Sequence, residues 1–338
     1  MILEHGQRPP PPPDSTSAGQ TMEGVRFHAM GTQCEIQYRA HDVAAGKAFV
    51  SEATAWVAAF EAKYSRFRAD SLISRVNAAA GRDWVEIDAD VGRMFAFADQ
   101  IHVLSRGIID ITTLPLLRLW NCKAATPRVP TSDEVRATTA KVGWARVRRE
   151  PGRIYLPETG MGLDLGGFGK EFAVDRVAEI ARSHGIANAL VDFGHDVRVR
   201  GAPADAPCWT IGVEDAGRLG GIRCRLSMNV GAVATSGNYL HFFEAEGQRC
   251  GHVIDPRTGY PVSGECHSVT AIAGSCLEAG LLATTAFVLG PEEGRALIEE
   301  YFGAEGIIHC DKRELKTTGF HRYVASPRAD PLLSGAKE

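Results

Sequence analysis

The segment from His252 to Gly259 carries side chains that could act on a phosphate ester or a pyrophosphate. It combines a histidine, a carboxylate, an arginine and a threonine in a turn that follows a predicted strand. Arginine pairs with phosphate oxygens and histidine titrates near neutral pH, so this composition fits chemistry on a phosphate group. A plain Pro/Gly turn explains the same residues, with Asp255 bonding the backbone and Arg257 closing a salt bridge. The segment alone therefore leaves both interpretations open.

A second segment, Asp164–Lys170, places three glycines in four positions just before a predicted helix. Glycines let the backbone approach a ligand closely, and the free N–H groups at a helix start suit a phosphate. Lys170 would add a point charge. The spacing matches neither a Walker A sequence nor a dinucleotide-binding fingerprint, so a tight strand-to-helix turn is an equal alternative.

Two further stretches offer hydroxyl groups. Val233–Tyr239 places small hydroxylated residues at a strand end, where they could hydrogen-bond a nucleotide or simply form a turn. Ser275–Phe287 predicts a buried helix in which Thr284 or Thr285 could offer a hydroxyl to a site. Either threonine could instead bond the carbonyl four residues earlier. Neither stretch identifies a function by itself.

The pattern of apolar residues predicts the helices and strands that would position these segments. Helical spacing predicts an amphipathic helix over 43–64, and a cap signal at Thr131 and Ser132 predicts another over about 132–141. Further helices are expected at about 90–105, 172–184, 275–289 and 291–302. A strand or hairpin is expected at 24–39, hairpins at 146–155 and 306–318, a single strand at 187–201, and a strand-rich stretch at 208–252. Because strands and helices do not strictly alternate, the expected fold class is α+β. A compact β-rich lobe packed against helices, with loops meeting in a cleft, fits better than a doubly wound sheet.

Composition limits the classes of function. The 338 residues are 44% apolar and 23% charged, which suits one large domain or two lobes around a cleft. The net charge is −4 and the charges are interspersed, so no nucleic-acid partner is expected. The sequence contains no run of about 18 apolar residues, so no membrane-spanning segment is expected. Eight cysteines without a C-x-x-C pair predict reduced thiols rather than a zinc site or a disulfide framework.

The two ends of the chain differ from the rest. Residues 1–22 include five consecutive prolines and predict a disordered leader, without the basic start, apolar run and cleavage site of a signal peptide. Residues 326–338 predict a flexible tail. The domain itself is expected over 23–325, and the location expected from the N-terminus and the cysteines is cytoplasmic.

Eight stretches, in order between about residues 25 and 305, resemble the ApbE family, the FAD:protein FMN transferases. They are Met30–Thr32; Ser65–Arg75; Gly107–Asp110 with Pro115, Leu116 and Trp120; Asp164–Lys170 with Ala173–Asp175; Gly194 with Asp196–Val199; Ala234–Gly237; His252–Gly259; and Leu282–Thr284. No single stretch is decisive, but their common order argues against chance similarity.

The resemblance implies a two-lobed fold with a β-rich core packed by helices around a central cleft. It implies that FAD binds between the lobes, with Mg²⁺ at the diphosphate. Such enzymes cleave FAD, attach FMN through a phosphoester to a threonine or serine of a partner protein, and release AMP. The implied partner is an acceptor flavoprotein, which the sequence does not name.

The resemblance also assigns site residues. The residues implied to hold the flavin or the nucleotide are Met30, Phe67, Ile108, Ile109, Asp110, Asp164, Lys170 and Ile254. The residues implied in catalysis are His252, Arg257 and Thr284. The metal would take the backbone carbonyl near Gly167 and the hydroxyl of Thr284, which follows the helix aspartate of the family pattern by four residues.

Three positions depart from that pattern. Gly280 stands where the helix aspartate would face the metal together with Thr284, since residues four apart share a helix face. Glu171 and His195 stand where glycine is common. These departures keep an alternative open: a repurposed relative that binds FAD or another ligand without metal-dependent flavin transfer. A non-enzymatic flavin-nucleotide carrier or regulatory partner is a third interpretation.

Overall fold

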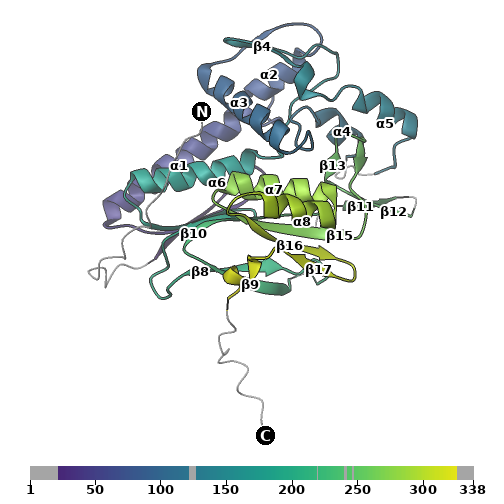
Figure 1. The fold of residues 1–338 in the computed structure, drawn as a ribbon. Helices are drawn as coiled ribbons and strands as arrows, with labels where there is room; N and C mark the ends of the chain where they lie inside the picture. Colours follow the sequence, from purple (N-terminus) through teal and green to yellow (C-terminus); the bar gives the residue numbers. More distant parts are fainter. Residues whose placement is uncertain (1–21, 122–126, 219, 240–241, 246, 326–338) are drawn as a thin grey trace.

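The computed structural model describes residues 22–121, 127–218, 220–239, 242–245 and 247–325. Within them, an antiparallel sheet of eight strands runs through the centre of the molecule (Figure 1). Its strands, in spatial order, are β1 (Glu23–Ala29), β2 (Thr32–Arg39), β6 (Asn188–Phe193), β7 (Asp196–Arg200), β10 (Val230–Gly237), β15 (Cys266–Ala273), β16 (Glu305–Cys310) and β17 (Glu314–Lys316). β1 and β2 form a hairpin in the predicted range, and β16 and β17 form the predicted closing hairpin. The predicted leader, apart from Met22, and the predicted tail lie outside the described residues.

One face of this sheet is covered by helices (Figure 1). They are α1 (Val43–Tyr64), α6 (Gly169–Ser183), α7 (Cys276–Leu289) and α8 (Pro291–Glu300). α1 spans the predicted range because its apolar residues recur at helical spacing and are buried in the main core. α7 is almost wholly apolar and packs on β10 and β15. None of the helices in the described ranges combines the length and the hydropathy that spanning a membrane requires.

The opposite face of the sheet is covered by the hairpin of β8 (Trp209–Glu214) and β9 (Ile222–Met228), together with the short turn η2 (Phe320–Tyr323). Trp209, Leu226 and Phe320 form an apolar cluster there with residues of the sheet. Because both faces are covered, the strand β15 is buried along nearly its whole length.

A smaller lobe lies over one end of the helical layer, at the top of Figure 1. Its elements are α2 (Leu72–Ala78), α3 (Ala89–Leu104), α4 (Leu114–Leu119), α5 (Ser132–Thr139), η1 (Trp144–Arg146), β3 (Val85–Glu86), β4 (Arg148–Glu150) and β5 (Arg153–Tyr155). Its core contains Trp144 and Phe95, and Phe60 of α1 and Leu281 of α7 join it to the helical layer. The cap predicted at Thr131 is confirmed by a reciprocal capping box on α5. The predicted two-lobed α+β architecture is confirmed.

Two small hairpins lie in the predicted strand-rich stretch. They are β11 (Phe242–Ala245) with β12 (Gln248–Gly251), and β13 (Ile254–Asp255) with β14 (Tyr260–Pro261). The two lobes are tied together here, because the Trp120 indole N–H donates to the Gly259 carbonyl at 2.8 Å.

The single strand predicted over 187–201 is wrong, because this stretch is the hairpin of β6 and β7. Gly194 and His195 form its two-residue turn, with φ values of 60° and 71°. A two-residue turn keeps the apolar positions of the two strands in one continuous alternation, as at Val191, Phe193, Val197 and Val199, so periodicity does not reveal it. α6 also begins at Gly169, before the predicted start at Phe172, since its first turn is made of the glycine-rich segment.

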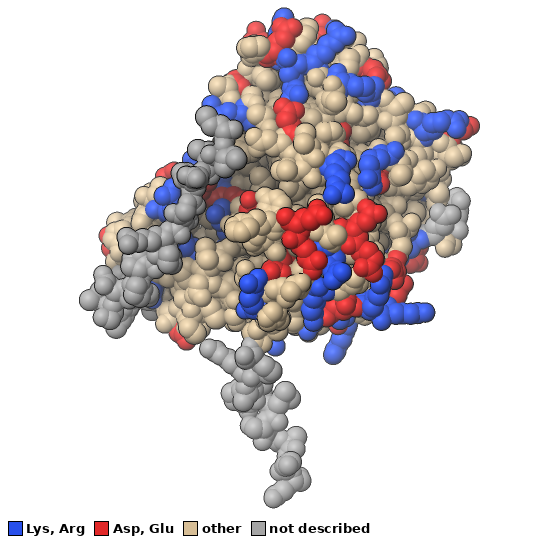
Figure 2. Space-filling model, viewed as in Figure 1, with Lys and Arg blue, Asp and Glu red and all other residues tan. Residues whose placement is uncertain are grey.

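The face of the molecule in Figure 2 mixes Lys and Arg with Asp and Glu. Acidic side chains gather near its centre, and basic side chains flank them on several sides. Neither sign of charge covers a broad area of the described surface in this view, in keeping with the interspersed charges of the sequence.

Candidate functional site

A cavity of about 390 Å³ is formed by residues of the smaller lobe, the helical layer and one end of the sheet. It brings together the four segments that the sequence singled out. Their described members at the cavity include Asp164, Gly166, Gly167, Lys170, Ala234 to Gly237, Tyr239, His252, Ile254 and Thr284, joined by Ile108, Ile109 and Asp110. Two other hollows, of about 580 and 420 Å³, lie beside α3 and α1, and none of the predicted site residues is among their described lining.

The glycine-rich turn forms one wall of the cavity and leads into α6. The Asp164 carboxylate accepts a hydrogen bond from the Gly166 N–H at 2.6 Å and pairs with the Arg66 guanidinium. A Cβ atom at Gly166 would lie 2.8 Å from that carboxylate, so glycine lets the turn close. The Asp164 N–H donates to the Ile111 carbonyl at 2.7 Å, which ties this wall to the 108–111 loop. α6 therefore starts at the cavity, where its N-terminal dipole favours an anion.

Lys170 connects α6 to the turn between β6 and β7. Its Nζ lies 2.6 Å from the Asp196 carboxylate and 3.3 Å from the Gly194 carbonyl. Burial lowers the pKa of Lys170, but the Asp196 and Glu171 carboxylates together outweigh it, so the pKa lies above its ordinary value. Burial raises the pKa of Asp196 against the opposing effect of Lys170. The lysine therefore stays charged, and Asp196 already balances that charge.

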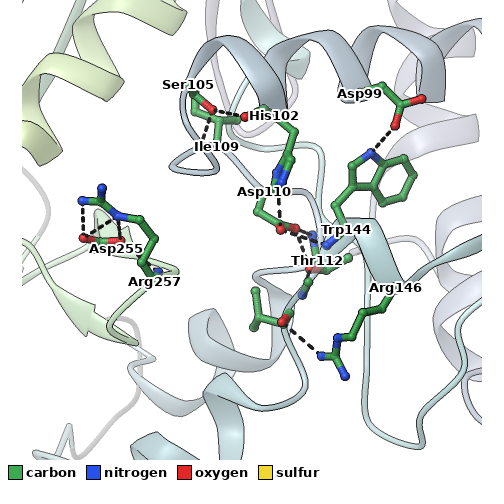
Figure 3. A network of polar contacts seen from close by, with 12 residues as sticks. Asp99, His102, Ser105, Ile109, Asp110, Thr112, Trp144, Arg146, Asp255 and Arg257 are labelled. Carbon is green, nitrogen blue, oxygen red and sulfur yellow. Dashed lines mark hydrogen bonds and ion pairs between the residues drawn. The ribbon is translucent and has the colours of Figure 1, made fainter.

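A hydrogen-bond network fixes the 108–111 loop (Figure 3). The Asp110 carboxylate accepts from the Thr112 N–H at 2.7 Å, from the Thr112 hydroxyl at 2.5 Å and from the Trp144 N–H at 2.9 Å. His102 Nδ1 lies 3.5 Å from the same carboxylate. These donors all belong to the smaller lobe, so Asp110 lies at the cavity but uses its charge to hold the loop in place.

The segment from His252 to Gly259 divides into two parts. His252 and Ile254 line the cavity, whereas Arg257 is not among the described lining residues. Arg257 Nη2 lies 2.8 Å from Asp255 Oδ2, and the two side chains face each other in Figure 3. The Asp255 carbonyl accepts from the Gly259 N–H at 2.8 Å, and a Cβ atom at Gly259 would overlap a threonine hydroxyl of α5. Asp255 and Arg257 thus pair with each other within the turn, as the turn interpretation predicts, whereas His252 and Ile254 line the cavity.

α7 presents Gly280 and Thr284 to the cavity, about one helical turn apart. The Thr284 hydroxyl lies 2.6 Å from the Ser236 hydroxyl of β10, so the two hydroxyl-bearing segments meet. Thr285, the alternative candidate, is buried and is not among the described lining residues. The space beside Gly280 is filled by Glu171, whose Cγ would lie 2.7 Å from a Cβ atom at position 280.

The family model described as the ApbE family matches residues 30–308. The chain belongs to the ApbE family. A protein of Vibrio cholerae named FAD:protein FMN transferase is 31% identical over 310 residues, which cover 90% of this chain and 91% of that protein. A protein of the same name from Treponema pallidum is 30% identical and covers 86% of this chain.

Solved ApbE structures share the fold. The ApbE protein of Thermotoga maritima has a TM-score of 0.82 at 28% identity, covering 90% of this chain and 100% of the other. The Pseudomonas stutzeri flavinyl transferase ApbE, in its apo form, has a TM-score of 0.80 at 26% identity, covering 91% of this chain and 98% of the other. The fold and family expected from the resemblance are therefore confirmed.

Glu171 and His195, the two departures from the ApbE pattern outside α7, differ in place. Glu171 is buried and lines the cavity, and its Oε2 atom has no hydrogen-bond partner among the described residues. Burial raises the pKa of Glu171, and the neighbouring Asp196 carboxylate raises it further. His195 is exposed in the β6–β7 turn and is not among the described residues that line the cavity.

Met30 and Phe67, implied by the ApbE resemblance, are not among the described lining residues. Met30 lies in the β1–β2 turn with a φ of 54°, and its N–H donates to Glu61 at 3.0 Å. Phe67 is 79% exposed, and the Arg66 guanidinium lies 4.1 Å from its ring centroid. Because Arg66 also pairs with Asp164, this exposed ring is held beside the glycine-rich wall.

Sequence reasoning missed the residues that support the site. Arg66 and Asp196 pair with Asp164 and Lys170, and Trp144 supplies a donor to Asp110. Arg66 and Asp196 fall within stretches that resemble the ApbE pattern, which marked their neighbourhood but not their partners. These partners are distant in the chain and meet only in the folded protein.

Proposed function

We propose that this member of the ApbE family is an FAD:protein FMN transferase, which binds FAD in the cavity and attaches FMN to a threonine or serine of an acceptor flavoprotein. The observation that supports it is the cavity itself, which gathers a glycine-rich helix start, the hydroxyls of Ser236 and Thr284, and the imidazole of His252. The relatives named FAD:protein FMN transferase match nearly the whole chain.

The proposed reaction is a phosphoryl transfer. The acceptor hydroxyl oxygen forms a bond to the phosphorus of the FMN half, the bond from that phosphorus to the bridging oxygen breaks, and AMP leaves with that oxygen. The acceptor hydroxyl gives up its proton. His252 carries the only imidazole among the described lining residues, so it is the group proposed to orient the hydroxyl or accept its proton.

The walls of the cavity suggest how FAD would be held. The start of α6 and Lys170 would face the diphosphate, because helix N-termini and cations favour anions. Ile108, Ile109 and Ile254 give apolar surface for a ring system, and the exposed ring of Phe67 lies close to the same wall. The residues proposed to act by holding these walls in place are Met30, Asp110, Asp164 and Arg257.

Mg²⁺ is the proposed companion of the substrate. Gly167 and Thr284 both line the cavity, which supports the proposal that the Gly167 carbonyl and the Thr284 hydroxyl would hold it. Hard cations prefer oxygen ligands that include carboxylates, and Gly280 provides none. The buried Glu171 carboxyl lies against Gly280 with one oxygen unpartnered among the described residues, so the donor set fits a divalent cation. Such an ion would neutralise charge on the diphosphate.

The test of this function is the transfer itself. Purified protein is incubated with FAD, Mg²⁺ and candidate acceptor flavoproteins, and the acceptors are weighed by mass spectrometry. A true acceptor gains the mass of FMN less water, with one AMP released for each FMN attached. The same acceptor with its modified threonine replaced by valine is the control. FAD binding without any mass gain across all candidate acceptors would contradict the proposal.

A second candidate function, FAD binding without metal-dependent transfer, is motivated only by the missing carboxylate at Gly280, and the relatives named FAD:protein FMN transferase do not favour it. It predicts equal FAD affinity in Mg²⁺ and in EDTA, with no release of AMP. Titration of flavin fluorescence under both conditions separates it from the transferase. The cytoplasmic location also stays a prediction, which cell fractionation of the protein and its acceptor would test.

A further inference from the structure

We propose that Glu171 of α6 supplies the carboxylate ligand for a divalent cation at this site, in place of a side chain at Gly280 of α7. The inference deepens the proposed function and rests on it for the identity of the substrate. Its physical basis is the contact between Glu171 and Gly280, together with the buried oxygen that this contact leaves without a partner among the described residues.

Glu171 occupies the space that a side chain at Gly280 would need. A Cβ atom at position 280 would lie 2.7 Å from Glu171 Cγ, 2.9 Å from Oε1 and 3.1 Å from Cδ. An aspartate at position 280 would therefore collide with the glutamate, and the two carboxyl groups compete for one place. The Glu171 carboxyl thus reaches from α6 to the face of α7 that also carries Thr284.

The Glu171 carboxyl is buried without a cation of its own in the described structure. It is 8% exposed, and its Oε2 atom accepts no hydrogen bond from the described residues. Lys170, which interacts with it, lies 2.6 Å from Asp196 and is balanced by that carboxylate. A buried carboxylate is costly unless a cation or hydrogen-bond donors compensate for the lost water. The partner that fits is a cation from outside the chain.

Residues with three kinds of oxygen line this cavity. The Glu171 carboxyl, the Thr284 hydroxyl and the Gly167 backbone all belong to lining residues. Carboxylate, hydroxyl and carbonyl oxygens suit Mg²⁺ and Mn²⁺, and the diphosphate of a nucleotide would add further oxygens. The Ser236 hydroxyl, 2.6 Å from that of Thr284, is placed to orient the threonine.

The two departures from the ApbE pattern at these positions explain each other. The resemblance to the ApbE pattern implies an aspartate at position 280 and a glycine at position 171, whereas here Gly280 has no side chain and Glu171 brings a carboxylate from α6. Because one side chain fills the space that the other would need, either exchange alone would leave a gap or a clash. As a pair, the exchanges keep one carboxylate at one place.

The competing explanation is that Glu171 only fills the volume beside Gly280. Burial raises the pKa of this carboxyl, so a neutral filler is chemically reasonable when no cation is bound. A filler needs the shape of the side chain, whereas a metal ligand needs its charge. Glutamine has nearly the same shape and no charge, so the Glu171→Gln variant separates the two roles.

Mn²⁺ binding measured by electron paramagnetic resonance, with FAD present and no acceptor protein, tests the inference. The unmodified protein should bind Mn²⁺, with Mg²⁺ competing. Glu171→Gln should weaken Mn²⁺ binding on the order of 10- to 100-fold. Glu179→Gln removes an exposed carboxylate from the same helix and should bind Mn²⁺ as the unmodified protein does. FAD affinity in EDTA should be equal in all three proteins, which also shows that the variants are folded.

The double variant Glu171→Gly with Gly280→Asp moves the carboxylate back to α7. It should recover Mn²⁺ affinity close to that of the unmodified protein, whereas Gly280→Asp alone should not, because its side chain collides with Glu171. Unchanged Mn²⁺ affinity in Glu171→Gln would overturn the inference. So would a failure of the double variant to recover binding, or the absence of Mn²⁺ binding in the unmodified protein with FAD bound.

The metal experiment is separate from the transfer experiment, because it uses no acceptor. Mn²⁺ binding that depends on Glu171 in a protein that transfers no FMN would refute the proposed function and leave the ligand role standing. FMN transfer by a protein whose Mn²⁺ binding does not depend on Glu171 would support the proposed function and refute the ligand role of Glu171. The two proposals therefore fail independently.

Discussion

Asp110 and Glu171 both place a buried carboxyl group at the cavity, but the two groups differ in their hydrogen-bond partners. They are 7% and 8% exposed. The Asp110 carboxylate accepts three hydrogen bonds from Thr112 and Trp144, whereas one Glu171 oxygen has no partner among the described residues. A carboxylate whose acceptor positions are filled holds the fold, and one with an unfilled position is available to a ligand. Burial at a cavity therefore does not by itself identify a functional residue.

Other side chains around the cavity also divide into those paired within the protein and those available to a ligand. Asp164 and Arg257 use their charges in short-range pairs, with Arg66 and Asp255 respectively. The ring of Phe67 is instead 79% exposed beside the glycine-rich wall. We expect substitutions of the paired residues Asp164 and Arg257 to change stability, and substitution of the exposed Phe67 to change ligand binding.

Lys170→Met tests the charge balance around Glu171 and has the largest expected effect. The substitution leaves Asp196 and Glu171 as buried carboxyl groups without the lysine charge between them. The Asp196 side chain is 6% exposed and that of Lys170 is 30% exposed, so the substitution leaves a buried carboxylate without its partner, and we expect the free energy of unfolding to fall by about 3 kcal/mol. Urea denaturation measures it, and Lys312→Met, at an exposed position, is the control. Equal small losses of unfolding free energy in Lys170→Met and Lys312→Met would show that the Lys170 charge does not stabilise the buried carboxyl groups.

Asp110→Ala tests the filled carboxylate. The Thr112 and Trp144 N–H groups lose their acceptor in the interior, so the free energy of unfolding should fall by about 2 kcal/mol. Asp110→Asn keeps one acceptor oxygen and should cost less. Asp83→Ala, at an exposed aspartate of the same lobe, serves as the control in the same denaturation experiment. Lost FAD binding with unchanged stability would instead assign Asp110 to the ligand.

The sequence predicted the elements whose signals are local. α1 follows from the spacing of its apolar residues, α7 from its long apolar run, and the cap at Thr131 from neighbouring residue types. The glycine-rich turn and the segment at His252 were likewise visible, because their chemistry lies within a few residues. The resemblance to the ApbE family supplied their order and the expectation of one site.

The sequence could not predict which polar groups are satisfied. Asp110 lies between two isoleucines and Glu171 lies between Lys170 and Phe172, but these neighbours do not show which carboxyl group has its acceptor positions filled. The distinction depends on Trp144 in one case and on Gly280 in the other, and both are distant in the chain. It arises only when α6 packs on α7 and η1 packs on the 108–111 loop. Such pairings belong to tertiary structure, which local patterns do not encode.

Phe67→Ala should weaken FAD binding with little effect on stability. A ring that packs on one face of a flavin or adenine contributes about 1 kcal/mol, or roughly a fivefold change in affinity. Because Phe67 is already 79% exposed, the free energy of unfolding should change by less than about 0.5 kcal/mol. Quenching of flavin fluorescence measures the affinity, and Phe302→Ala, at a fully exposed ring, is the control. Equal FAD affinity in both variants would exclude Phe67 from the site.

Glu171→Gln in EDTA has the smallest expected effect and completes the comparison with Asp110. Burial raises the pKa of Glu171, so the metal-free protein holds this group largely as a neutral acid that glutamine closely resembles. The free energy of unfolding should therefore change by less than about 1 kcal/mol, in contrast to Asp110→Ala. FAD with Mg²⁺ should then raise the melting temperature of the unmodified protein more than that of Glu171→Gln, because a ligand that binds only the folded state stabilises it. A large loss of stability already in EDTA would place Glu171 beside Asp110 as a group that holds the fold.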